Sequence, residues 1–340
     1  MLLSRFYQIE TGKKYLKKCF ETSNFYKKSK TLNKPKVSII IPIFNCENSI
    51  KFSISSIQNQ RLKEIEIILV NDFSKDNSKY VIENMQKYER RIFLINNNKN
   101  MGTLYSRNIG AMLAKGKYIF ALDHDDMFLN DYIIQKIYKI AEINDYDIIG
   151  FKTIYVNKNL LYDEPFIKDK NDKIVIQPKL KFLSFRNAES HIWGKCIKNE
   201  IYKRAISLMG IKRSNTYLCY SEDEVILFMI FSIAKIYRYI PNFGLFHFVS
   251  KNSASFKLSR NHKIFARLFY ADLIFDLTSD NFFEKKFALH ILIGVKNYIK
   301  KRFHINKANK KYLKYLIKKM DNCSFISKIN KDYLKNNFYS

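Results

Sequence analysis

Glycine, proline and cysteine are scarce in this chain of 340 residues, which contains nine, five and five of them respectively. The cysteines are odd in number, lie far apart and show no paired spacing, which excludes a disulfide scaffold and a cysteine-based zinc site. No Gly-Lys-Ser or Gly-Lys-Thr triplet occurs, and the Rossmann dinucleotide fingerprint is also missing. Any nucleotide that the chain binds must therefore have its phosphates neutralised without a glycine-rich loop.

Long apolar runs are absent as well. No run reaches the roughly 18 to 20 residues that a membrane span requires. The nearest, FALHILIGV at 287–295, is short and is flanked by lysines. The first residues, MLLSRFYQIETGKK, lack the continuous apolar core of a secretory signal. We therefore expect a cytoplasmic chain that crosses no bilayer.

Acidic residues are few, because 31 Asp and Glu oppose 60 Lys and Arg and leave a net charge of +29. A field of this size attracts polyanions and anionic membranes. Codon bias is the simpler explanation, since Lys, Asn, Ile, Phe and Tyr, the residues of AT-rich codons, are all abundant. We favour codon bias for most of the charge and expect no nucleic-acid partner, with peripheral contact with an anionic membrane as the alternative.

The distribution of apolar residues predicts an α/β domain. Strand-like runs rich in β-branched residues occur at 37–44, 64–72, 91–96 and 117–123. Between these runs, apolar residues recur at helical spacing. Strands that alternate with helices predict a mainly parallel sheet with helices on both faces, and a ligand site beyond the carboxyl ends of the strands.

Polar residues collect where three of these runs end. Asn45 follows the first run, Asn71 and Asp72 end the second, and YIFALDHDDMF at 118–128 places three carboxylates after the fourth. Like charges this close raise one another's pKa unless a cation lies among them. We therefore expect a divalent cation, Mg²⁺ or Mn²⁺, held by oxygen ligands.

The order of the three carboxylates suggests which of them face the cation. Alternate side chains of an extended segment share a face, so Asp123 and Asp125 can point at one metal, or at a metal and a ribose. Asp126 would point away and brace the loop. A second interpretation needs no ligand, because an acidic surface turn could simply cap a helix that begins near Asn130.

Residues 36–155 resemble glycosyltransferase family 2, whose catalytic domain has the GT-A fold. Four motifs occur in the family's order within VSIIIPIFNCENSIKFSISSIQNQ, EIILVNDFSKDNS and NMGTLYSRNIGAMLAKGKYIFALDHDD. They are a strand with a Pro-x-Phe-Asn turn, a second strand ending at Asp, an Asn-x-Gly to Arg-Asn-x-Gly helix, and a DxD segment. The resemblance implies an α/β fold with a Rossmann-like, mainly parallel sheet and helices on both faces.

The resemblance also divides the chain. A basic lead-in at 1–35 would precede a catalytic domain at 36–256, in which 36–130 binds the nucleotide-sugar and 131–256 binds the acceptor. The remaining 257–340 are basic and show helical periodicity. We expect a helical C-terminal extension that packs on the catalytic domain, or alternatively settles on an anionic lipid surface.

On the donor side, the resemblance assigns Asp72 to the base of the nucleotide. Pro42, Phe44 and Asn45 belong to the turn that shapes the nucleotide-sugar site. Arg107 would support the donor site, whereas the alternative for an arginine on a helix is a solvated or locally paired side chain.

Within the acidic segment, the resemblance assigns Asp123 to the ribose or the metal, and Asp125 to the metal that bridges the diphosphate. Some relatives place the direct ligand at the last Asp of this segment, so Asp126 is the alternative ligand. His247 occupies a place where relatives carry Tyr or His, and we expect it to pack rather than to ligate metal. The arginine that usually follows is absent, and Lys251 is the candidate replacement near the diphosphate.

The resemblance assigns two later segments to the acceptor site. In HIWGKCIKNEIY, Trp193 would stack on a sugar as a wall of the acceptor pocket, or else be a core indole, while His191 is expected at the surface. In SEDEVI, the family's Glu-Asp pair falls at Glu222 and Asp223, with Asp223 as the catalytic base and Glu222 on the acceptor side. The alternative is that Ser221 caps a helix and the acids only complement its dipole.

The implied activity is an inverting transfer of a hexose or N-acetylhexosamine from a nucleoside-diphosphate donor, most simply a UDP-sugar. The acceptor would be a hydroxyl of a glycan, a lipid-linked or a protein-linked molecule, as in polysaccharide biosynthesis. A sugar-phosphate nucleotidyltransferase shares the sheet type but needs a glycine-rich loop that PIFNCENS lacks. A catalytically inactive, polyanion-binding relative is the third interpretation, and four intact carboxylates speak against it: Asp72, Asp123, Asp125 and Asp223.

Overall fold

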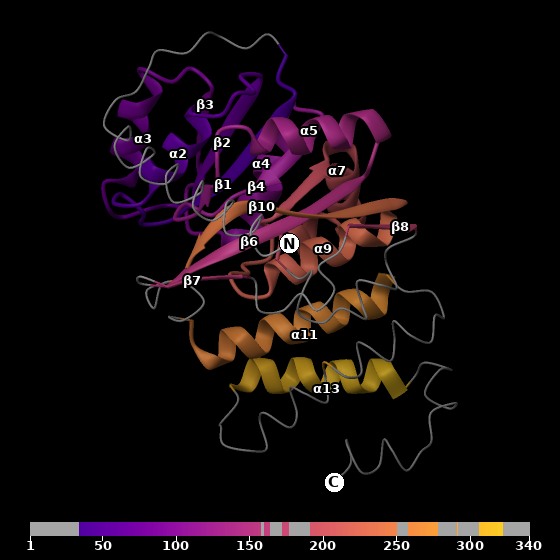
Figure 1. Ribbon diagram of the computed structural model, residues 1–340. Coiled ribbons are helices and arrows are strands. Elements are labelled where there is room, and N and C mark those ends of the chain that lie inside the picture. The colour runs from indigo at the N-terminus through magenta and orange to yellow at the C-terminus, as the bar shows by residue number, and fades with distance from the viewer. Residues whose placement is uncertain are drawn as a thin grey trace.

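The computed structural model describes residues 34–157, 160–163, 172–176, 191–249, 258–277, 291 and 306–321. A ten-stranded mixed sheet runs through the described chain in the order β3-β2-β1-β4-β9-β6-β10-β5, with β7 paired to β6 and β8 to β10 (Figure 1). The strands are β1 (Val37–Ile43), β2 (Ile65–Asn71), β3 (Ile92–Asn96), β4 (Tyr118–Ala121), β5 (Met127–Phe128), β6 (Ile148–Asn157), β7 (Leu160–Asp163), β8 (Lys173–Ile176), β9 (Lys195–Lys198) and β10 (Ile236–Phe248).

The first half of the sheet is parallel, as the sequence predicts. β1 lies between β2 and β4 and is parallel to both, and β2 is parallel to β3. All seven residues of β2 are buried, because helices cover both faces of this part of the sheet. Coverage on both sides explains why these strands appear in the sequence as continuous apolar runs rather than as alternating patterns.

The second half of the sheet is mixed. β9 is antiparallel to both of its neighbours, β4 and β6. β10 is parallel to β6 but antiparallel to β5 and β8. The expected mainly parallel arrangement therefore applies to the part of the sheet that carries the first four strands.

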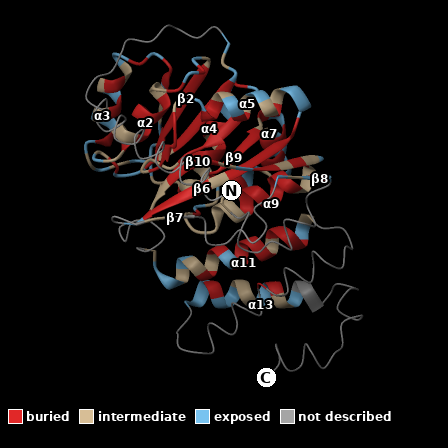
Figure 2. Ribbon diagram, in the orientation of Figure 1, coloured by how far each residue is buried: buried red, intermediate tan, exposed pale blue. Residues whose placement is uncertain are grey.

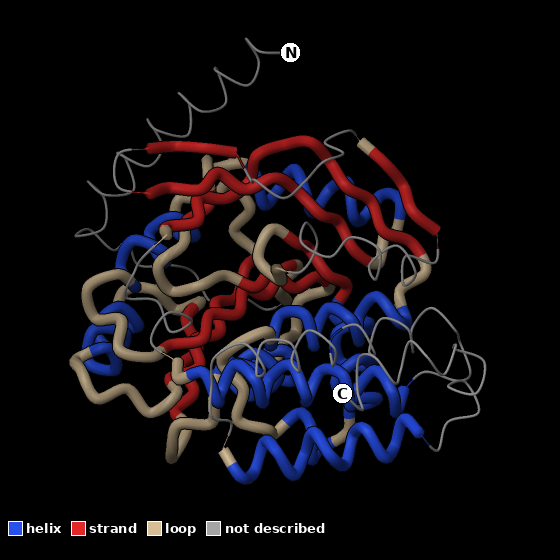
Figure 3. The backbone as a smooth tube through the Cα atoms, turned by 90° about the horizontal axis from the view of Figure 1, so that it is seen from below, coloured by secondary structure: helices blue, strands red, loops and turns tan. Residues whose placement is uncertain are grey.

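Helices pack against both faces of the sheet and form two cores (Figure 2). α2, α3 and α5 cover one face, and α4, α7, α9 and α11 cover the other. α13 packs on the outer side of α11, so it is the outermost of the described helices on that face (Figures 1 and 3). The helices are α2 (Ile50–Gln58), α3 (Ser78–Gln86), α4 (Thr103–Leu113), α5 (Ile133–Asn144), α7 (Asn199–Met209), α8 (Ile211–Ser214), α9 (Glu222–Ile233), α11 (Arg260–Leu277) and α13 (Lys307–Asp321).

Parts of the expected organisation lie outside the described residues. They include 1–33 of the basic lead-in and Lys251. The C-terminal extension is helical where it is described, at α11 and α13. Among the described helices, none combines the length and the apolar character that a bilayer span needs.

Candidate active site

The parallel strands bring the predicted polar residues to one edge of the sheet. β1 and β2 are in register up to the pair Ile43 and Asn71, and the backbone N–H of Asp72 donates to the Ile43 carbonyl at 2.8 Å. β4 lies on the other side of β1 and leads into the acidic segment. Carboxyl ends of parallel strands at such an edge are where ligands bind in open α/β sheets.

Arg107 of α4 links the two halves of the site. Its guanidinium donates from Nη2 to Asp123 Oδ1 at 2.6 Å, and from Nη1 to Glu222 Oε1 at 2.9 Å and to Asp223 Oδ1. The side chain is only 3% exposed. Burial alone would lower the pKa of Arg107, but the three carboxylates raise it above its usual range, so the guanidinium is a permanent cation. Arg107 is therefore locally paired, and its partners come from both the donor and the acceptor segments.

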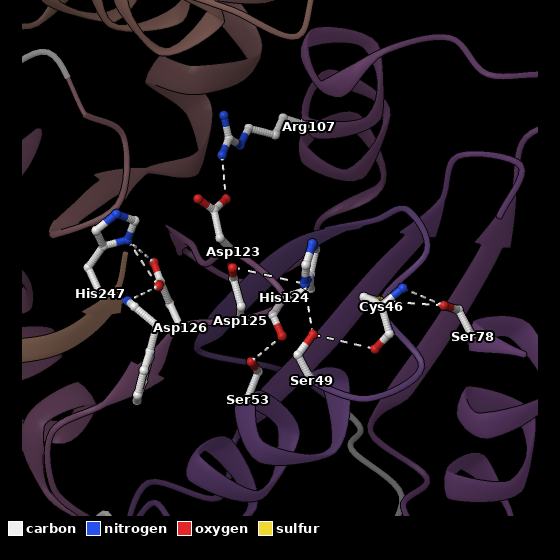
Figure 4. Close-up of polar contacts among 11 residues, drawn as sticks. Cys46, Ser49, Ser53, Ser78, Arg107, Asp123, His124, Asp125, Asp126 and His247 are labelled. Atoms are coloured by element: carbon white, nitrogen blue, oxygen red, sulfur yellow. Dashed lines mark hydrogen bonds and ion pairs between the residues drawn. The ribbon is translucent and has the colours of Figure 1, made fainter. Parts of the chain in front are cut away.

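The acidic segment spreads its side chains in different directions (Figure 4). Burial raises the pKa of Asp123, but the Arg107 charge outweighs burial and leaves this pKa below its usual value. Burial, together with the neighbouring Asp123 carboxylate, raises the pKa of Asp125. His124 turns toward α2, where its Nδ1 lies 3.0 Å from Ser49 Oγ and its carbonyl accepts from Ser53 Oγ at 2.6 Å.

Asp126 is fully buried and braces the segment against β10. Both of its carboxylate oxygens lie 3.0 Å from His247 Nδ1, and Oδ1 also accepts from the Phe248 N–H at 3.1 Å. Burial lowers the pKa of His247, but the Asp126 carboxylate outweighs burial and raises it to about 9. Burial raises the pKa of Asp126 itself to about 7, and the protonated Nδ1 of His247 donates to its carboxyl group. This environment leaves Asp126 poorly placed for the alternative role of metal ligand.

The remaining carboxylates fit a divalent cation in part. Asp125 is 30% exposed, and its ion-pair partner among the described residues is His124, at 4.0 Å. Among the described residues, no three His, Cys, Asp or Glu side chains gather as a ready metal cage. Mg²⁺ commonly takes one or two carboxylates and completes its shell with water and substrate phosphates. Asp125, with Asp123 beside it, supplies the carboxylates for such a site.

Trp193 does not offer a free face to a sugar, which corrects the expectation of stacking. His191 stacks on the indole at a centroid distance of 4.3 Å, and His247 stacks at 4.7 Å, each within 16° of parallel. The indole is 5% exposed and also meets Tyr155 edge-on at 5.8 Å. The core interpretation of Trp193 therefore holds. His191 is not a surface imidazole either, since its ring stacks on the indole and its Nδ1 is buried, and burial lowers its pKa to about 3.

The first turn of α9 presents the two expected acids. Ser221 has a left-handed φ of +54° and its side chain makes no capping hydrogen bond, so the capping alternative lacks its defining contact. Asp223 Oδ2 accepts from the Ile192 N–H at 3.4 Å. Burial, and then repulsion between the two neighbouring acids, raises the pKa of Glu222 to about 8, and burial raises that of Asp223.

On the donor side, Asp72 holds the loop before α4. One carboxylate oxygen accepts from the Met101 N–H at 2.7 Å and from Asn97 Nδ2 at 2.8 Å, and the other accepts from the Gly102 N–H at 2.8 Å. Gly102 has a φ of +87°, and an added Cβ would lie 2.8 Å from the Leu218 N. Asp72 therefore fixes the backbone of the loop at Met101 and Gly102, at the edge of the sheet where the donor is expected.

The turn after β1 is the exposed part of the donor side. Asn45 has a φ of +51° and accepts from the Lys75 N–H at 2.8 Å, which joins it to the loop after β2. Phe44 is 42% exposed and Phe73 is 40% exposed, and Lys75 Nζ lies 3.6 Å above the Phe73 ring. Pro42, in β1, is half-buried. Sequence reasoning missed Phe73, although a large aromatic residue directly after a polar strand end was a usable signal.

The sequence of this chain matches a known protein family and several of its members. A family model described as "Glycosyl transferase family 2" matches residues 38–207. The uncharacterized glycosyltransferase EpsJ of Bacillus subtilis is 40% identical over 116 residues, 34% of this chain and 33% of EpsJ. The Campylobacter jejuni GalNAc(5)-diNAcBac-PP-undecaprenol beta-1,3-glucosyltransferase is 40% identical over 97 residues, 28% of this chain and 31% of that enzyme.

A longer match exists at lower identity. The cholesterol galactosyltransferase of Borreliella burgdorferi is 29% identical over 244 residues, 68% of this chain and 65% of the relative. The chain thus spans about a third of the first relatives above and about two thirds of this one. Among solved structures, S. aureus TarS 1–349 in complex with UDP-GlcNAc has a TM-score of 0.55 at 16% identity, over 78% of this chain and 71% of TarS 1–349. The likeness to TarS shows that the two chains share a fold.

Proposed function

This chain belongs to glycosyl transferase family 2, and from that premise we propose that it is an inverting glycosyltransferase. It would move a hexose or N-acetylhexosamine from a nucleoside-diphosphate donor to an acceptor hydroxyl. The observation that carries the proposal is the buried Arg107 guanidinium, which holds Asp123 of the donor segment and Asp223 of α9 at the same time. Such an arrangement suits a reaction in which one carboxylate serves the leaving group and another serves the attacking hydroxyl.

The proposed donor is a UDP-sugar. Its base would lie at the carboxyl edge of β1 and β2, between the exposed ring of Phe44 and the loop that Asp72 orders. Pro42 and Asn45 set the path of the turn that carries Phe44. The solved TarS structures support this donor class, since they contain UDP and UDP-GlcNAc.

Asp125 and Asp123 are the residues that would hold Mn²⁺ or Mg²⁺ at the diphosphate. When bound there, the cation would act as a Lewis acid on the leaving UDP. The chain's own contribution is to keep Asp123 ionised through Arg107 and to anchor the segment through Asp126 and His247. Both contributions keep the two carboxylates in position before the donor arrives.

Asp223 is the proposed general base. It would accept the proton of the acceptor hydroxyl while the oxygen attacks the anomeric carbon and the bond to UDP breaks, so the anomeric configuration inverts. Its burial raises its pKa and makes it a better proton acceptor. Arg107 and the Ile192 N–H fix the carboxylate in place, and Glu222 lies beside it on the acceptor side.

The proposed acceptor is a glycan or a lipid-linked molecule, as in polysaccharide biosynthesis. The names of two relatives support a lipid-linked acceptor, since one is described as acting on an undecaprenol-linked glycan and the other on cholesterol. Because the Trp193 indole is 5% exposed and stacks on two imidazoles, the acceptor would be bound by other groups near Glu222 and Asp223.

The proposal is tested by incubating the protein with a panel of UDP-sugars and Mn²⁺ and measuring UDP release, first with water and then with added glycan acceptors. We expect one donor to be hydrolysed faster than the rest and its turnover to rise with an acceptor. UDP binding without turnover of any donor, together with catalysis of nucleotidyl transfer from UTP to a sugar phosphate, would contradict the proposal.

A further inference from the structure

The outer face of α13 carries a regular stripe of lysines. At 3.6 residues per turn, five lysines of this helix fall within an arc of about 100°. All five side chains are exposed. Leu316, which is 0% exposed, lies on the opposite side of the helix. The lysine stripe consists of Lys307, Lys310, Lys311, Lys314 and Lys318.

Packing against α11 fixes the direction in which the lysine stripe faces. Asn309 Nδ2 donates to the Asn261 carbonyl at 2.8 Å, and the Tyr312 hydroxyl donates to Asp272 Oδ2 at 2.9 Å. Leu316 joins the core between the helices. These three contacts along one side fix the rotation of α13 about its axis, and α13 is the outermost of the described helices on its face (Figure 1). The stripe therefore points away from the described helices and the sheet.

Within the part of the chain that the structure describes, no carboxylate forms an ion pair with the lysine stripe. The only acidic residue of α13 is Asp321, at its last position. None of the five lysines forms an ion pair with another described residue. Elsewhere on the described surface acids accompany lysines, as in Lys79 with Glu83 at 3.7 Å and Lys117 with Glu142 at 2.8 Å. Codon bias raises the number of lysines, but it does not align them on one face and remove the acids from it.

We propose that the lysine stripe binds an anionic phospholipid surface, with α13 lying parallel to the membrane plane. A flat, negatively charged surface complements five aligned ammonium groups at once. Tyr315 flanks the stripe, is 52% exposed, and is a residue type that favours the headgroup region. This inference goes beyond the proposed catalytic function and does not depend on it, because the stripe lies on α13 rather than at the strand ends that form the active site.

Sedimentation of the full chain with vesicles tests the proposal. The vesicles contain phosphatidylcholine alone or with about one third phosphatidylglycerol, at low and moderate salt. Each lysine near an anionic surface contributes about a five-fold gain in partitioning. A variant with Lys310→Gln, Lys311→Gln and Lys314→Gln should therefore bind anionic vesicles about 100-fold more weakly. Binding to phosphatidylcholine alone should be weak for every protein.

A matched variant distinguishes the effect of the lysine stripe from the effect of the protein's net charge. Lys87→Gln, Lys136→Gln and Lys139→Gln remove the same charge from exposed positions on the side of α3 and α5, and this control should bind like the unmodified chain. Equal loss in both variants would overturn the proposal in favour of net charge. A chain that binds soluble heparin through the stripe but does not bind anionic vesicles would also overturn it, in favour of a polyanionic chain. Unfolding midpoints confirm that all three proteins are folded.

Discussion

The guanidinium of Arg107 donates a hydrogen bond to the carboxylate of Asp223, which lies 116 residues further along the chain. The same guanidinium donates to Asp123 at 2.6 Å. One buried cation therefore joins the segment after β4 to the first turn of α9. A shift of either carboxylate would break an ion pair to a guanidinium that is only 3% exposed, so Arg107 restrains the spacing between the donor and acceptor segments.

Replacing Arg107 should destabilise the fold strongly. Arg107→Met leaves three partly buried carboxylates without the buried cation that pairs with them, and loss of one partner of a buried ion pair costs about 3 to 5 kcal/mol. Urea unfolding measures this loss. Arg61→Met is the control, because Arg61 is 61% exposed where it meets Asp131 and such a pair is worth about 1 kcal/mol or less. Equal small losses in both variants would show that Arg107 does not neutralise the cluster.

The same variant should show a distinct dependence on pH. Without Arg107, the folded-state pKa values of its three carboxylates lie above their unfolded values. The penalty is then largest at neutral pH and shrinks as the pH falls below about 4, because the carboxylates become protonated in both states. Unfolding at several pH values tests this, and a penalty that stays constant with pH would point to lost packing rather than to charge.

Asp223→Asn should abolish most transfer while leaving donor binding intact. The amide is nearly isosteric and its single oxygen can still accept from Arg107, but it cannot take up a proton. Positioned proton transfer supplies roughly 100- to 10,000-fold in rate, so turnover should fall by that amount at unchanged UDP affinity. Asp172→Asn, at an exposed pair with Arg238, serves as the control. Transfer close to that of the unmodified chain would remove Asp223 from the chemistry and direct the search to Glu222.

Asp72→Asn should weaken UDP binding and also lower stability. The carboxylate accepts from two backbone N–H groups, of Met101 and Gly102, and leaving such a donor unpaired costs about 1 to 3 kcal/mol. Asp147→Ala is the control, since it removes the carboxylate oxygen that accepts from the Lys235 and Ile236 N–H groups away from the site. Both variants should lose stability, but calorimetry should find weaker UDP binding for Asp72→Asn alone. Unchanged UDP affinity would make Asp72 a purely structural residue.

The pair of His247 and Asp126 should make stability fall at alkaline pH. The folded-state pKa of His247 is raised to about 9 because the Asp126 carboxylate outweighs burial, whereas its ordinary value is about 6.5. The stabilisation is therefore fully present below about pH 6.5 and is lost as the pH rises through about 9, and it amounts to at most about 3 kcal/mol. Chemical unfolding between pH 6 and pH 10 measures it. The slope should disappear in His247→Asn and persist in His262→Asn, which changes an exposed histidine.

The sequence predicts those elements whose burial produces a recognisable pattern of neighbouring residues. The buried parallel strands β1, β2 and β4 are covered on both faces, and such strands must be continuously apolar. The sequence does not predict β5 or β9, because β5 has only two residues and β9, KCIK, has a lysine at each end, so neither forms a continuous apolar run. Their antiparallel pairing is decided by contacts with β10, β4 and β6 that are distant in the sequence.

The same distinction applies to the site. The motifs contained the residues at strand ends, including Asp72, Asp123 and Asp125. The pairing of Asp126 with His247 joins residues 121 positions apart, and the covering of Trp193 by His247 is equally non-local. Contacts between residues so far apart leave no pattern in the sequence. For this reason the sequence did not reveal that the Trp193 indole, expected to stack on a sugar, packs against histidines instead.

UDP binding should depend on a divalent cation, and Asp125 should be the residue that causes this dependence. Arg107 already neutralises Asp123, whereas Asp125 has no comparable cation among the described residues and would face the diphosphate as a like charge. Calorimetry of UDP with Mn²⁺ and then with EDTA should show binding that is about 10- to 100-fold weaker without metal. Asp125→Asn should reduce this difference to about two-fold or less, while Asp126→Asn should lower stability and leave the difference in place. Equal UDP affinity with Mn²⁺ and EDTA in the unmodified chain would show that the acidic segment does not act through a metal. Loss of metal dependence in Asp126→Asn rather than Asp125→Asn would move the ligand to the last carboxylate of the segment.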